Sequence, residues 1–96
     1  MRPSEVLPLH RETIRQLVTE AGMTNPRVFG SVARGEDNEE SDLDILVDVS
    51  RGTSLLTLVR VQDDLAKVTG VKVDLRTPGD IHPRFRDRVL SEAAAL

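Results

Sequence analysis

Residues 42–49 read Asp-Leu-Asp-Ile-Leu-Val-Asp-Val, and this stretch decides the fold class of the chain. Apolar residues alternate along it with residues that are mostly acidic. Such alternation is typical of a β-strand, because successive side chains of a strand leave opposite faces of the sheet. The apolar face consists of Leu43, Ile45, Val47 and Val49, and the other face carries Asp42, Asp44, Leu46 and Asp48. We therefore predict a strand with one face in the core and one face of mainly carboxylate character.

The same alternation recurs at residues 71–76. Val71, Val73 and Leu75 point one way, and Lys72, Asp74 and Arg76 point the other. A further short strand is expected at residues 27–29, directly after Pro26 and before Gly30. Strands that alternate with helical patterns indicate an α/β domain.

Three helices are expected around these strands, together with a brief helical turn at residues 31–34. The first helix has Pro8 in its first turn, ends at Gly22 and buries a stripe of Ile14, Leu17, Val18 and Ala21. The second begins after the N-cap Ser54, ends at Gly70 and buries Leu55, Leu58, Val61, Leu65 and Val68. The third begins near His82-Pro83 and packs Phe85, Val89, Leu90 and Ala93. We predict one α/β domain over residues 1–96, with a small mixed sheet flanked by helices.

The composition excludes several classes of protein. The chain has 96 residues and no cysteine, which excludes a disulfide framework and is expected for a cytoplasmic protein. Its longest apolar runs are broken by Asp44 and Asp48, so no membrane span is expected. The net charge is −3, and apart from Arg84, Arg86 and Arg88 the basic residues are scattered. Direct nucleic-acid binding is therefore not expected.

Three carboxylates are candidates for a catalytic metal site. Asp42 and Asp44 lie two residues apart and leave the same strand face, and Asp74 lies on the polar face of its own strand. If the two strands are neighbours, the three carboxylates converge and repel each other, and divalent cations relieve this repulsion. Mg²⁺ prefers such oxygen ligands, and a pair of ions can assist an in-line displacement. Taken alone, an Asp-x-Asp at the start of a strand is also compatible with turn chemistry.

Gly30 and Ser31 are candidates for a phosphate site. A glycine after a strand lets the backbone approach a ligand closely, and the free N–H groups of a helical turn bind anions. A Gly-Ser pair at this position is also compatible with a simple turn. The acidic run at residues 36–40 is expected to be a solvated loop.

Residues 30–44, Gly-Ser-Val-Ala-Arg-Gly-Glu-Asp-Asn-Glu-Glu-Ser-Asp-Leu-Asp, resemble the signature of the DNA polymerase β-like nucleotidyltransferase superfamily. The matching parts are the Gly-Ser, the Ala-Arg-Gly and the Ser-Asp-x-Asp, and Asp74 matches the third acid of the family. More narrowly, they resemble the minimal nucleotidyltransferases, which are themselves short chains, so the resemblance covers nearly all residues. It implies the polymerase β-like nucleotidyltransferase fold.

The resemblance also implies roles for individual residues. Gly30 and Ser31 would hold the triphosphate of ATP. Asp42 and Asp44 would hold two Mg²⁺ ions, and Asp74 would contribute to the ion that activates the acceptor hydroxyl and help to take its proton. Arg34 would position the loop or the phosphates, or else form a structural ion pair with nearby acids.

Finally, the resemblance implies a protein partner. Only one helix can follow Asp74, whereas larger members of the superfamily carry an acceptor-binding domain. Minimal nucleotidyltransferases are often encoded beside a HEPN-domain RNase toxin, and the chain is similar to antitoxins that transfer AMP to a tyrosine of that toxin. The leading hypothesis is an adenylyltransferase antitoxin in a hetero-oligomer with its toxin. Two alternatives remain open: a non-catalytic module that neutralises its partner by contact, and a small-molecule nucleotidyltransferase with a separate acceptor-binding subunit.

Overall fold

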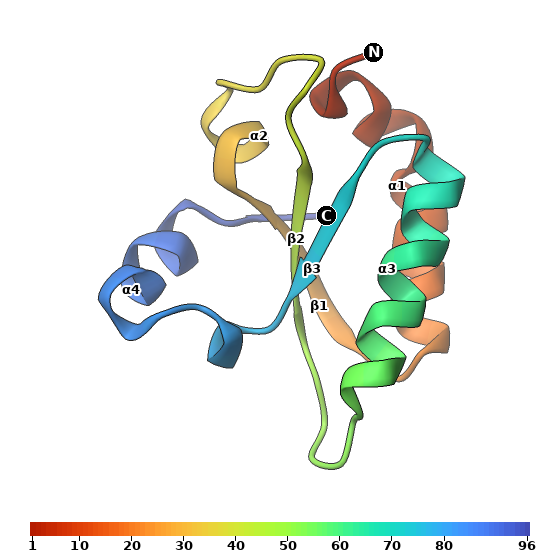
Figure 1. Cartoon of the computed structure of the whole chain (residues 1–96), viewed down its shortest axis with the longest axis vertical. Helices are drawn as coiled ribbons and strands as arrows, with labels where there is room; N and C mark the ends of the chain where they lie inside the picture. The colour runs from red at the N-terminus through yellow and green to blue at the C-terminus, as the bar shows by residue number, and fades with distance from the viewer.

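The computed structural model of the chain describes residues 1–96, which form an α/β domain with the elements labelled in Figure 1. Along the chain these elements are α1 (Pro3–Glu20), β1 (Thr24–Phe29), α2 (Gly30–Arg34), β2 (Leu43–Asp48), α3 (Leu55–Thr69), β3 (Val73–Arg76), the 3₁₀ turn η1 (Pro78–Asp80), α4 (Pro83–Glu92) and β4 (Ala94–Ala95). No helix combines the length and the apolar character that crossing a bilayer requires.

The four strands form one mixed sheet in the order β3-β2-β1-β4. Strands β2 and β3 are parallel, and helix α3 makes the crossover between them, whereas β1 is antiparallel to both β2 and β4. Helices α1 and α3 cover one face of the sheet, and α2 and α4 lie on the other side (Figure 1). The predicted small mixed sheet flanked by helices is confirmed.

The main core lies between the sheet and the layer of α1 and α3. The apolar positions that alternate along β2 and β3 point into this layer, where they meet the buried stripes of the two helices. Its members include Ile14, Val18, Val28, Leu43, Ile45, Val47, Val61, Leu65, Val73 and Leu75. The alternate residues of β2 and β3 therefore face the side of α2 and α4, and this leaves Asp44 and Asp74 outside the main core.

Helix α4 differs from the sequence prediction. None of its residues is buried, and Phe85 and Leu90 are 45% and 42% exposed, so half of the stripe expected to pack is open to solvent. The helix ends at Glu92, after which Ala94 and Ala95 pair with β1 and Leu96 enters the core. A two-residue strand is too short to show a periodic pattern in the sequence. It forms because the backbone N–H and C=O groups on the outer edge of β1 need hydrogen-bond partners.

Smaller differences concern the ends of elements. Helix α1 begins at Pro3, so Pro8 lies inside the helix and not in its first turn. Strand β1 begins at Thr24, and its pairing with β2 is irregular between Thr24 and Arg27. Strands β2 and β3 are shorter than predicted, and Leu55 at the start of α3 is 75% exposed. These boundaries depend on neighbouring elements, which local patterns do not describe.

The loop between α2 and β2 is not a purely solvated loop. Asp37 is only 8% exposed, and its Oδ2 accepts a hydrogen bond of 2.9 Å from the backbone N–H of Ser4 in the first turn of α1. A carboxylate at this place satisfies an N–H without an intrahelical partner and interacts favourably with the helix dipole. Asp37 thus caps α1 from a distant point of the sequence.

Replacing Asp37 by alanine is expected to lower the free energy of unfolding by about 1 kcal/mol, the usual cost of losing a helix cap. Urea unfolding at pH 7 measures the change. Glu39→Ala is the matched control, because Glu39 is exposed in the same loop. Equal stability of the two variants would show that Asp37 does not act as a cap.

Candidate active site

Asp44 lies at the centre of the acidic face. In the sheet its Cα is opposite Asp74 on β3 and opposite Phe29 on β1. The condition set by the sequence, that these two strands be neighbours, is therefore met. Asp42 directly precedes β2 and is not part of the strand itself. The start of β2 and the paired strand β3 thus bring the three predicted acids to one region, beside the end of β1.

Gly30 lies against the same carboxylate. It follows β1 directly, and its φ of 71° lies in the left-handed region that favours glycine. A Cβ on Gly30 would overlap Oδ2 of Asp44. Ser31 follows in α2, a single helical turn that ends at Gly35 with φ 72°. The two predicted halves of the site, the Gly-Ser turn and the acids, are therefore in contact through Gly30 and Asp44.

Burial raises the pKa of Asp44 to about 6, and the carboxylates of Asp74 and Asp42 add to the rise. The positive charges of Arg76 and Arg34 offset part of it. Because the folded protein holds this proton more tightly than the unfolded chain does, stability is lost as the pH rises from about 4 to about 6. Above that pH range Asp44 is ionised in the folded protein, and its destabilising effect has reached its maximum.

We expect Asp44→Asn to increase the free energy of unfolding at pH 8 by about 1–2 kcal/mol, the pKa shift discounted for partial exposure of the side chain. Below about pH 3 the gain should vanish, because Asp44 is then mostly protonated in both the folded and the unfolded state. Urea unfolding at pH 8 and at about pH 2.5 measures the difference, and Asp63→Asn on the exposed side of α3 is the control. A gain of the same size at both pH values would show that charge repulsion is not its cause.

The donor set fits a divalent metal ion. All three acids offer carboxylate oxygens, the ligands that Mg²⁺ prefers, and the crowding of like charge at Asp44 is the condition that a cation relieves. As the side chains lie, no three acids or histidines of the chain are grouped closely enough to share one ion. The two outer acids are engaged with basic side chains. Lys72 Nζ lies 3.8 Å from Oδ2 of Asp42, and Arg76 Nε donates to Oδ2 of Asp74 at 3.0 Å.

Arg34 lies at the end of α2 and bridges two elements. Its guanidinium contacts Glu36 at 3.1 Å and Glu92 of α4 at 3.3 Å. These are the structural ion pairs that the sequence left open beside a role in positioning phosphates, and that second role stays a prediction. Sequence reasoning did not foresee the contacts of Asp37, Lys72 or Arg76. For the last two, the only sequence signal was their alternation with Asp74.

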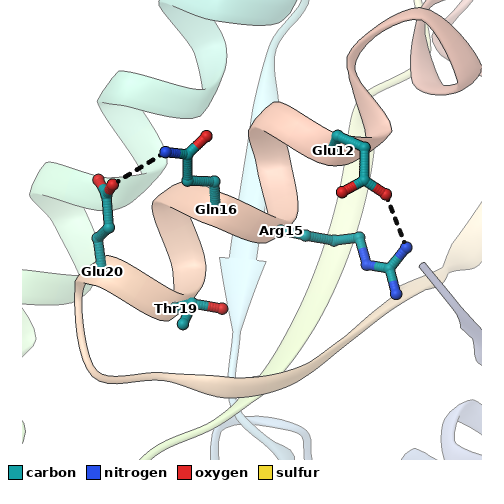
Figure 2. Close-up of a pocket in the computed structure, with 5 residues that line it drawn as sticks. All are labelled: Glu12, Arg15, Gln16, Thr19 and Glu20. Atoms are coloured by element: carbon teal, nitrogen blue, oxygen red, sulfur yellow. Dashed lines mark hydrogen bonds and ion pairs between the residues drawn. The ribbon is translucent and has the colours of Figure 1, made fainter.

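The one hollow in the protein surface lies elsewhere. It has a volume of about 390 Å³ and is lined by Glu12, Arg15, Gln16, Thr19 and Glu20, all on the outer side of α1 (Figure 2). Arg15 donates to Glu12 and Gln16 donates to Glu20, so most of its polar groups already have partners within the helix. We therefore place the candidate site at the acids, which are partly exposed on the side of the sheet that faces α2 and α4.

Comparison with known proteins identifies the class of protein that this fold and these acids define. A family model described as the nucleotidyltransferase domain matches residues 9–96, and the chain belongs to this family of enzymes. A candidate protein adenylyltransferase of Methanocaldococcus jannaschii is 43% identical over 83 residues, which cover 86% of this chain and 89% of the relative. The protein adenylyltransferase MntA of Thermococcus cleftensis is 34% identical over a match that covers 91% of this chain and 85% of the relative.

Solved structures narrow the class to the minimal nucleotidyltransferases. A structure described as a candidate minimal nucleotidyltransferase is 43% identical, with a TM-score of 0.86 over 97% of this chain and 95% of that one. Two structures share the fold at lower identity. The first is a toxin–antitoxin with AMP-PNP. It has 20% identity and a TM-score of 0.76, and the match covers 88% of this chain and 69% of that one. The second is a tri-AMPylated Shewanella oneidensis HEPN toxin in complex with MNT antitoxin. It has 18% identity and a TM-score of 0.71, and the match covers 92% of this chain and 69% of that one.

Proposed function

We propose that this nucleotidyltransferase is an antitoxin that transfers AMP from ATP to a tyrosine hydroxyl of a HEPN-family RNase toxin. The observation that carries the proposal is the pairing of Asp44 with Asp74 in the sheet, with Gly30 directly against Asp44. The names of the relatives, protein adenylyltransferases, support a protein acceptor. The distantly related complex of a tri-AMPylated HEPN toxin with an MNT antitoxin supports the choice of partner.

In the proposed reaction, the tyrosine oxygen attacks the α-phosphorus of ATP, the bond between this phosphorus and the bridging oxygen breaks, and pyrophosphate leaves. Gly30 and Ser31 hold the triphosphate. Asp74 accepts the proton of the attacking hydroxyl, and Asp42 and Asp44 would hold two Mg²⁺ ions together with Asp74. When bound, such ions supply charge stabilisation at the attacking and leaving oxygens.

The partial exposure of the acids supports a large acceptor. The side chains of Asp42 and Asp74 are 36% and 31% exposed, so both are accessible from solvent. The surface hollow is on α1 and does not adjoin the acids. A small-molecule acceptor is usually bound in a concave pocket, whereas a protein acceptor brings its own surface to the site. The arrangement therefore favours a protein over a small molecule.

Intact-mass analysis of the partner tests this proposal. A HEPN protein incubated with this chain, ATP and Mg²⁺ should gain the mass of one or more AMP groups, and peptide mapping should locate them on tyrosine. This chain serves as an internal control, since it has no tyrosine and should keep its mass. A partner that is neutralised without a mass change would show that the chain is a non-catalytic binding module. AMP on a small molecule would show that it is a small-molecule nucleotidyltransferase.

A further inference from the structure

A row of alternating charges runs along one side of the acid cluster. Lys72 precedes β3, and Asp74 and Arg76 follow at alternate positions, so all three share one face of the strand. The start of the neighbouring strand β2 is held beside this row, because the backbone N–H of Leu43 donates to the carbonyl of Lys72 at 2.8 Å. Each basic residue contacts one outer acid, Lys72 with Asp42 and Arg76 with Asp74.

These two ion pairs hold the oxygens that a metal ion would need. Asp42 and Asp74 each present Oδ2 to a basic group, and Asp44 between them makes no ion pair. The clustered negative charge of the three acids is thus already partly balanced by two cations of the chain itself. A divalent ion that binds Oδ2 of Asp42 or of Asp74 has to displace the basic group that contacts this oxygen.

Displacement of these cations costs little free energy. Lys72 is 80% exposed and its Nζ lies 3.8 Å from Asp42, which makes this ion pair a weak surface contact. Arg76 forms the firmer pair, with a 3.0 Å hydrogen bond, yet about half of its side chain is exposed. Both side chains are long enough to turn to another anion nearby, and guanidinium in particular matches phosphate oxygens.

We propose that Lys72 and Arg76 are exchangeable counter-ions of the active site: they balance Asp42 and Asp74 until divalent ions arrive, and they then bind the phosphates of the nucleotide. This role rests on the proposed nucleotidyl transfer at the same site. It makes free metal a weak ligand and the metal–nucleotide complex a strong one, because only the triphosphate gives the displaced cations new partners. The pair thereby favours joint binding of metal and nucleotide.

Mn²⁺ binding to the purified chain alone tests the first half of the exchange. Removing one positive charge beside the acids should tighten the binding of free Mn²⁺ about three- to ten-fold, as measured by electron paramagnetic resonance or calorimetry. This is expected for Arg76→Gln and, with a smaller effect, for Lys72→Gln. Arg76→Lys keeps the charge and should stay close to the parent. Arg60→Gln and Lys67→Gln on the exposed side of α3 are the controls, because they remove the same charges from the other layer.

The second half is tested with a non-hydrolysable ATP analogue in saturating Mn²⁺. Arg76→Gln should weaken the binding of the analogue about three- to ten-fold, because it removes a phosphate partner. Opposite changes in the two affinities are the signature of exchange. Unchanged Mn²⁺ binding in Arg76→Gln, or unchanged binding of the analogue, would overturn the proposal. Both measurements omit the toxin, so they remain decisive if the toxin proves not to be the acceptor.

Discussion

Asp44→Asn is expected to lower nucleotide transfer about a thousand-fold or more, equivalent to about 4 kcal/mol of transition-state stabilisation. Asp44 stands between the other two acids, opposite Asp74 in the sheet and two residues after Asp42. An amide in its place removes the central negative charge, and with it the main attraction for divalent ions. The rate of AMP transfer to the partner at saturating ATP and Mg²⁺ measures the loss.

The same substitution should make the folded protein more stable at pH 8, so the loss of activity cannot be attributed to unfolding. Asp63→Asn on α3 should transfer AMP at the parental rate. Excess chelator should reproduce the inactive state in the parent, and added Mg²⁺ or Mn²⁺ should reverse it. Undiminished transfer by Asp44→Asn, or by the parent in chelator, would exclude these acids as metal ligands.

The second large effect is expected at Gly30. Gly30→Ala should destabilise the protein by about 2–5 kcal/mol, because it combines a left-handed backbone at a non-glycine residue with overpacking against Asp44. Gly35→Ala is a closely matched control. Its φ is nearly the same, at 72°, but nothing lies within 4 Å of the new Cβ, so only the backbone cost of about 1–2 kcal/mol remains.

Nucleotide titration separates the effect of the steric clash with Asp44 from the effect of backbone strain. Gly30→Ala should lose most of its affinity for ATP, since Asp44 has to move away from the position it holds beside the Gly-Ser turn. Gly35→Ala should bind nearly as the parent does. Gly30→Val, with a larger side chain, should lose binding altogether. Equal affinities in Gly30→Val and the parent would refute the phosphate site.

Much of the fold could be read from local patterns. The alternation at residues 42–49 and 71–76 predicted two strands with the correct faces in the core, because burial of one face requires a period of two. Helix ends at Ser54 and Gly70 were also predicted, since an N-cap and a left-handed C-cap depend on single residues. Helix α4 was misjudged, because a stripe of apolar residues predicts amphipathic character but not the presence of a surface that covers it.

The sequence by itself predicted which residues would carry the chemistry: three acids on strand faces turned away from the core, and a Gly-Ser turn after a strand. Only the tertiary structure decided how they meet. The register sets Asp44 opposite Asp74, the end of β1 brings Gly30 against Asp44, and Lys72 and Arg76 take the outer acids as partners. Strand order and register arise from contacts between residues far apart in the chain. Local periodicity tells which way a side chain points but not which side chain it meets.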